Sequence, residues 1–124
     1  MNYKILLLIF FLIYSCTNPN LTKKKAVKQP VVQNYSNSGF TLIYSDDLYK
    51  SKIINKKLNN RDLFVFQKNL KKNTNVKITN PLNNKSIIAK VKSKSNYPNF
   101  YNSVITGRIA IEIDLDLNEP FIFI

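Results

Sequence analysis

The stretch VKITNPLNNKSIIAKVK, residues 76–92, decides the fold class of this chain. Apolar and polar residues alternate over 76–79 and again over 86–92, which is the period of a strand with one buried face. Between these segments, Asn80-Pro81 and Asn83-Asn84 are typical turn residues. The stretch therefore predicts a β-hairpin.

Other short apolar segments flank the hairpin at residues 40–44, 63–67 and 121–124. They are rich in β-branched and aromatic residues, which favour strands, and turns rich in Asn, Lys and Ser separate them. Short, regularly spaced strands with polar turns predict a small, mainly β barrel.

Residues 103–117 fit two patterns. Five aliphatic residues alternate with polar ones or Ala, which favours a strand: Ile109, Ile111, Ile113, Leu115 and Leu117. The same stretch also fits one face of a helix with Ser103 as its N-cap. From the pattern alone we predict a strand.

The composition limits the chemistry that is open to the chain. Its 124 residues, 44% hydrophobic and 21% charged, are typical of one globular domain. The chain has no His and one Cys, which excludes a His-based triad, a His or Cys metal cage and an internal disulfide. Two glycines are too few for a phosphate-binding loop. We therefore expect no metal and no cofactor.

The net charge of +12 comes almost entirely from lysine, with only Arg61 and Arg108 as arginines. Arg is preferred over Lys for two-point contacts with phosphates and base edges, so the pattern argues against a nucleic-acid partner. Lys, Asn and Ile, whose codons are rich in A and T, fill 50 of the 124 positions. Biased base composition, or an anionic wall or lipid surface, would explain the lysines.

The chain begins MNYKILLLIFFLIYSC, residues 1–16, with an unbroken apolar run of ten residues. A spanning helix needs about 20 apolar residues, whereas ten fit the core of a signal peptide. Ile13-Tyr14-Ser15-Cys16 resembles the lipobox of bacterial lipoproteins, although a Cys ending a buried core helix is the alternative. The resemblance implies that a signal, residues 1–15, is removed and that Cys16 is acylated.

Acylation at Cys16 would give a stable membrane anchor. Thr17 resembles the following residue of outer-membrane lipoproteins, so we expect an outer-membrane protein that faces the periplasm. Residues 16–38, which include the lipidated Cys, are polar and aperiodic and read as a flexible tether. The folded domain is expected over residues 39–124.

Residues 63–80, LFVFQKNLKKNTNVKITN, resemble a motif of the rare lipoprotein A (RlpA-like) family, L-T-A-A-H-K-T-L-P-x-G-T-x-V-R-V-T-N. Residues 83–94 and 39–45 are similar to neighbouring motifs of that family. The resemblance implies a six-stranded double-psi β-barrel, and it favours a short helix over 103–112, against the pattern alone. It also implies a role on peptidoglycan, because family members are lytic transglycosylases, often at the division septum.

The catalytic-type positions of the family are not retained. Gapless matching places Val104 where the family has its Asp, and Gln67 where it has a His. We therefore expect a degenerate barrel that binds peptidoglycan glycan strands without catalysis. The residues at cleft positions that could hydrogen-bond a sugar are Gln67, Lys92, Asn102 and Ser103. Tyr97, Phe100 and Tyr101 could stack on sugar faces, or they could be packing residues.

Two alternatives stay open. An active transglycosylase would need a carboxyl group from another position, and the weak candidates are Asp46, Asp47 and Asp62. Asp46 and Asp47 also read as a solvated turn, and Asp62 as a cap. A protein-interaction module that binds envelope or division proteins through a lysine-rich face is the other alternative.

Overall fold

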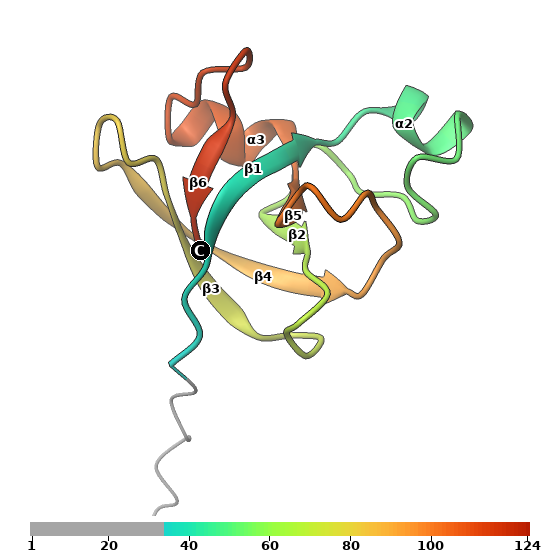
Figure 1. Cartoon of the computed structure of the whole chain (residues 1–124), viewed down its shortest axis with the longest axis horizontal. Helices are drawn as coiled ribbons and strands as arrows, with labels where there is room; N and C mark the ends of the chain where they lie inside the picture. Colours follow the sequence, from blue (N-terminus) through green and yellow to red (C-terminus); the bar gives the residue numbers. More distant parts are fainter. Residues whose placement is uncertain (1–33) are drawn as a thin grey trace, which may run out of the picture. The chain divides into compact units, whose positions relative to one another are not determined.

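Six strands close into a barrel in the computed structural model, which describes residues 34–124 as one compact unit (Figure 1). The strand order around the barrel is β1-β5-β2-β4-β3-β6. The strands are β1 (Ser38–Ile43), β2 (Phe64–Phe66), β3 (Asn75–Thr79), β4 (Ser86–Ser93), β5 (Ser103–Ile105) and β6 (Phe121–Phe123). The mainly β barrel that the sequence predicts is therefore confirmed. The signal, Cys16 and most of the tether lie outside the described residues.

The hairpin prediction is also confirmed. β3 and β4 pair antiparallel with Asn75 opposite Lys90 and Thr79 opposite Ser86. The remaining pairs join strands that are distant in sequence, and two of them are parallel, β1 with β5 and β2 with β4. β1 and β3 both pair with β6, which closes the barrel.

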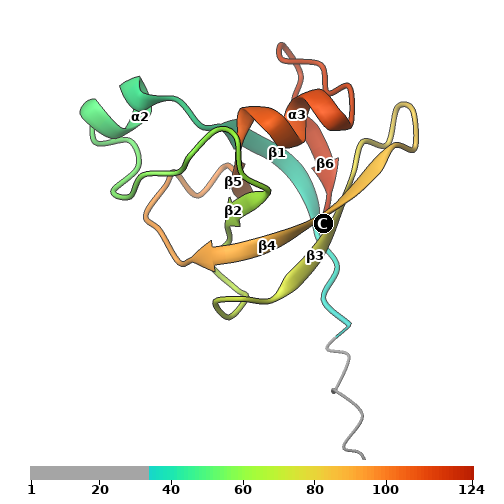
Figure 2. The ribbon, with the colours of Figure 1, turned by 180° about the vertical axis from the view of Figure 1, so that it is seen from behind.

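The ambiguous stretch contains one strand and one helix. Ser103–Ile105 form β5, and α3 follows over Gly107–Glu112 (Figure 2). The strand predicted beyond residue 105 is wrong, because Ile109 and Ile113 are fully buried while Ile111 is 77% exposed. That burial has the period of a helix.

The expected helix start at Ser103 is wrong as well. Ser103 pairs with Thr41 in β1, so the backbone there is extended. Thr106 is the N-cap, and its Oγ1 accepts from the Ile109 N–H at 3.5 Å. Asn60 Oδ1 accepts from the Gly107 N–H at 2.9 Å and so satisfies a second free donor of the first turn.

Two apolar clusters explain why β2 and β5 read as continuous apolar runs. Val65 and Ile105 belong to the larger cluster, whereas the adjacent Phe66 and Val104 belong to a second one. Both faces of these strands are therefore buried, and alternation with polar residues is lost. The second cluster also contains Tyr97, and it lies under residues 44–58, which include α2 (Asp46–Lys50). Figure 1 shows α2 at the periphery. The sequence predicted a single short helix, over 103–112, and read Asp46 and Asp47 as a turn, so α2 is a second helix that was not expected.

The segment just before β1 also contacts the barrel. The backbones of Asn37 and Ile124 exchange two hydrogen bonds of 2.9 Å, and Tyr35 packs against the larger cluster. These contacts attach the segment before β1 to the barrel. No helix among residues 34–124 combines the length and the apolar character needed to cross a membrane.

Candidate functional site

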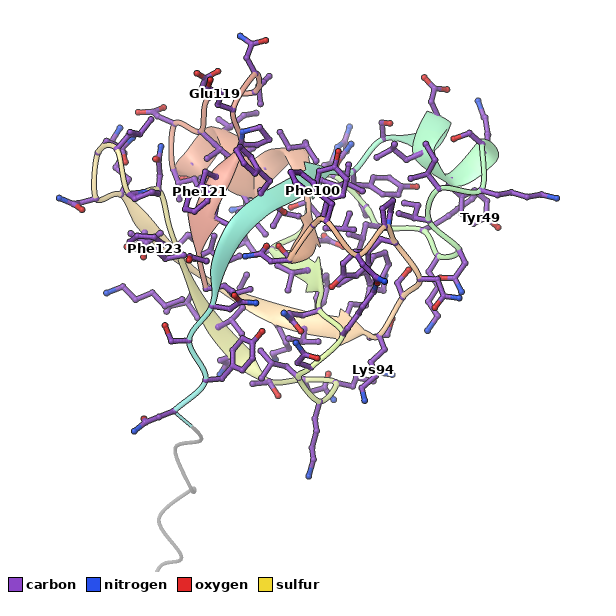
Figure 3. The ribbon with its side chains drawn as sticks, in the orientation of Figure 1. Tyr49, Lys94, Phe100, Glu119, Phe121 and Phe123 are labelled. Atoms are coloured by element: carbon purple, nitrogen blue, oxygen red, sulfur yellow. The ribbon has the colours of Figure 1, made fainter. Side chains whose placement is uncertain are left out.

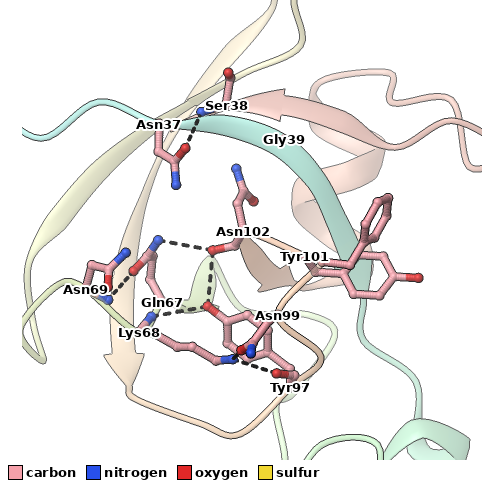
Figure 4. A pocket seen from close by; sticks show the side chains of 11 residues that line it. Asn37, Ser38, Gly39, Gln67, Lys68, Asn69, Tyr97, Asn99, Tyr101 and Asn102 are labelled. Carbon is pink, nitrogen blue, oxygen red and sulfur yellow. Dashed lines mark hydrogen bonds between the residues drawn. The ribbon is translucent and has the colours of Figure 1, made fainter.

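A pocket of about 300 Å³ opens beside the start of β1 (Figure 4). Three segments line it: residues 37–39, residues 67–69 just after β2, and the loop 97–102 before β5. We call it the amide pocket, because Asn37, Gln67, Asn69, Asn99 and Asn102 are among its lining residues. Barrel closure brings these three segments together.

Gln67 forms the floor of the amide pocket and is almost fully buried. Its Nε2 donates to the Tyr35 hydroxyl at 2.8 Å and to the Asn102 carbonyl at 3.1 Å. Its Oε1 accepts from the Asn69 N–H. Both ends of the amide are therefore used inside the protein, and Gln67 positions the pocket walls.

Lys68 holds the loop 97–102 in place. Its Nζ donates to the Tyr97 carbonyl at 2.6 Å and to Asn99 Oδ1 at 2.9 Å, and it lies 4.2 Å from the centre of the Tyr97 ring. The Tyr97 hydroxyl accepts from the Lys68 N–H at 3.2 Å and donates to the Asn102 carbonyl at 3.1 Å. The ammonium charge is thus committed to the protein, which fixes the pocket wall.

Burial raises the pKa of the Tyr97 phenol above its usual 10.0, and the hydrogen bond from the Lys68 backbone only partly offsets this. A phenol whose folded pKa is raised stabilises the fold below pH 10, and this stability is lost as the pH rises through the folded pKa. We therefore expect the free energy of unfolding to fall less steeply above pH 10 in Tyr97→Phe than in the wild type. Urea unfolding at pH 8, 10 and 11 measures this difference.

Tyr44 contributes separately to the alkaline slope, because burial and its hydrogen bond to Asp46 raise the pKa of its phenol. Tyr97→Phe should therefore retain the part of the slope that comes from Tyr44. Equal slopes for wild type and Tyr97→Phe would contradict the assignment.

Asn102 and Ser103 are adjacent in sequence, but only Asn102 lines the amide pocket. Ser103 is fully buried, and its hydroxyl shares a hydrogen bond of 2.9 Å with Thr41 and donates to Asn102 Oδ1 at 2.7 Å. It does not line the amide pocket, where the sequence predicted a sugar contact. Asn102 lines the pocket, and its buried Nδ2 has no hydrogen-bond partner among residues 34–124. Gly39 lies against this side chain, and a Cβ there would meet Asn102 Cβ at 3.5 Å.

Lys92 is not among the lining residues. Its Nζ lies 5.4 Å from the centre of the Phe64 ring instead. The structure therefore brings together Gln67 and Asn102 of the predicted hydrogen-bonding residues, but neither Lys92 nor Ser103. All three predicted stacking residues, Tyr97, Phe100 and Tyr101, line the pocket.

The three carboxylates considered as acids do not line the amide pocket. Asp46 and Asp47 lie in the first turn of α2, and Asp46 Oδ1 accepts from the Tyr44 hydroxyl at 2.8 Å. Asp62 lines a separate depression that also includes Arg108. No Asp or Glu is among the residues that line the amide pocket. Nor does any group of three His, Cys, Asp or Glu within residues 34–124 suit a metal ion.

The sequence patterns did not identify several residues of the pocket. They place Asn37 and Ser38 in the tether, and they give Asn69, Asn99 and Lys68 no role in the site. Lys68 occupies the Lys position of the family motif, and this match is the sequence signal that could have identified it as a site residue. Neither a family model nor a curated protein matches this chain.

Proposed function

We propose that this chain is an RlpA-like envelope lipoprotein whose barrel binds the glycan strands of peptidoglycan without cleaving them. The observation that carries the proposal is the lining of the amide pocket, which combines amide side chains and aromatic rings with no carboxylate. The closed six-stranded barrel supports the RlpA-like part of the proposal. The double-psi connectivity and the acylation of Cys16 stay predictions.

The chemistry of the lining suits an N-acetylated sugar. The Gln67 amide is engaged within the protein. The asparagine amides of the lining can both donate and accept, so they can pair with hydroxyl and acetamido groups of a glycan. Phe100, which is 70% exposed, and Tyr101 form an aromatic wall on one side of the pocket. Small-molecule sites commonly combine such apolar walls with a few placed polar groups.

The electrostatics of the pocket favour a neutral ligand. Lys68 is the charged residue of the lining, and its ammonium already donates to Tyr97 and Asn99. An anionic ligand would find no free cation in the lining. The uncharged parts of a glycan strand fit better than its carboxylates.

Cleavage of a glycosidic bond requires a carboxyl group that protonates the leaving oxygen and then takes up a proton. The amide side chains of this pocket cannot exchange a proton in this way near neutral pH. Asp46, Asp47 and Asp62 lie outside the lining. The geometry therefore favours binding over catalysis.

The test is co-sedimentation of the full chain, purified in detergent, with insoluble glycan stripped of its stem peptides. We expect retention that persists at about 0.5 M salt, because salt screens exposed charges but not hydrogen bonds and stacking. Ser38→Trp should fill the pocket and abolish retention. The matched control is Ser36→Trp, which changes an exposed serine outside the lining.

Release of the wild type by salt would contradict this proposal and indicate binding through surface lysines. Release of anhydro-sugar products into the supernatant would show catalysis instead. In that case Asp46→Asn, Asp47→Asn and Asp62→Asn would identify the acid.

A further inference from the structure

A second depression, of about 440 Å³, adjoins the amide pocket. The side chains that define it are Phe40, Leu42, Phe100, Tyr101, Leu117 and Pro120, and we call it the aromatic depression. Phe100 and Tyr101 line both hollows, so they form a shared wall. β1 also connects the two, because Ser38 and Gly39 line the first and the residues from Phe40 to Ile43 line the second.

Phe100 is held in place despite its exposure. Its ring stacks on Phe40 with an interplanar angle of 13° and a centroid distance of 5.6 Å, and it meets Tyr101 edge-on at 5.1 Å. Phe40 in turn meets Phe121 edge-on at 5.3 Å. Figure 3 shows Phe100 and Phe121 among the side chains that surround β1. Rings that brace one another present a flat apolar surface at little cost in side-chain entropy.

The charge of this surface identifies the kind of occupant. Residues 34–124 carry twelve Lys and two Arg against seven Asp and Glu. No charged residue lines the aromatic depression, and the single Lys of the amide pocket is engaged by the protein. A polyanion or an anionic headgroup would be expected to bind at the lysines elsewhere on this barrel. An uncharged occupant with an apolar face suits these two adjoining hollows.

A pyranose of the GlcNAc type has such a face, because the axial C–H groups at C1, C3 and C5 lie on one side of the ring and carry positive partial charge. They pack against the negative face of an aromatic ring, while the equatorial hydroxyls remain free to reach polar neighbours. Asn118 at the rim of the aromatic depression and the amides of the adjoining pocket are such neighbours.

We propose that the aromatic depression is a second sugar subsite, so that one glycan strand runs from the amide pocket across Phe100 toward Leu117. This proposal rests on the proposed function, because it extends the same binding site. Its consequence is that affinity increases with the length of the glycan, since the second contact is made by a chain that is already bound.

The test compares two β-1,4-linked GlcNAc oligomers, the dimer and the hexamer, by calorimetric titration of the full chain in detergent. Leu117 is 67% exposed and Leu82, at the β3–β4 turn, is 81% exposed, so both tolerate an acidic replacement. We expect Leu117→Asp to weaken hexamer binding about tenfold and to leave dimer binding unchanged, as loss of one well-packed contact would. Leu82→Asp should alter neither affinity.

Two results would overturn the second subsite while leaving the proposed function intact. One is unchanged hexamer binding in Leu117→Asp, and the other is an equal loss for dimer and hexamer. Failure of the wild type to bind either oligomer would instead remove the proposed function, and the second subsite with it.

Discussion

Replacing Lys68 with alanine is expected to weaken binding of the GlcNAc dimer about thirtyfold while the barrel stays folded. The replacement frees two or three loop residues, which must become ordered again when the sugar binds, and this ordering costs about 2 kcal/mol. The Lys68 ammonium joins the Tyr97 carbonyl to Asn99 Oδ1 and lies over the Tyr97 ring. Without it, the loop 97–102 loses the contacts that hold the aromatic wall beside the amides. Calorimetric titration measures the affinity, and circular dichroism monitors the fold.

Lys92→Ala is the matched control. It also removes a lysine whose ammonium lies over an aromatic ring, that of Phe64, but it does not line the amide pocket. We expect no change in dimer affinity. Equal weakening by both variants would show that net charge, rather than the position of the loop, governs binding.

Asn80→Ala is expected to lower the free energy of unfolding by about 3 kcal/mol, since it removes three hydrogen bonds of a buried amide at about 1 kcal/mol each. Asn80 Nδ2 donates to the carbonyls of Ile113 and Asp114 at 3.1 and 3.0 Å, and its Oδ1 accepts from the Leu82 N–H at 3.0 Å. These bonds attach the turn between β3 and β4 to the end of α3. Urea unfolding at neutral pH measures the change.

Asn83→Ala provides the comparison for that prediction. Asn83 is exposed, although its Nδ2 also donates to the Ile113 carbonyl, at 3.0 Å. Water can replace the bonds of an exposed amide, so we expect a loss of about 1 kcal/mol or less. A similar loss for both variants would show that the buried position of Asn80 contributes nothing extra.

The parts of the fold that were predictable are those fixed by local pattern. Alternation and turn residues indicated the β3–β4 hairpin, whose strands are neighbours in sequence. The end of β5 at Ile105 was not predictable in this way, because its strand pairs with β1 and β2, both distant in sequence. Beyond it, the alternation of isoleucines with polar residues matched a strand, but α3 buries only those on one helical face.

The site was predictable only in part, for a related reason. Gln67 and Asn102 were identified by resemblance, and they meet because the barrel closes. Ser103 was proposed on the same grounds, but its hydroxyl is buried. A shift of one residue along a strand moves a side chain to the opposite face, so adjacent residues cannot be assumed to share one face. The contribution of Lys68 depends on the path of the loop 97–102, which no local pattern specifies.

The measurement that tests the central claim most directly is an NMR titration of the isotope-labelled full chain with the GlcNAc dimer. We predict saturable shifts at the backbone amides of Lys68, Asn69 and Asn102, with the same affinity at low and high salt and an unchanged sugar spectrum after prolonged incubation. Shifts confined to lysines outside the pocket, or no shifts at saturating sugar, would contradict the account.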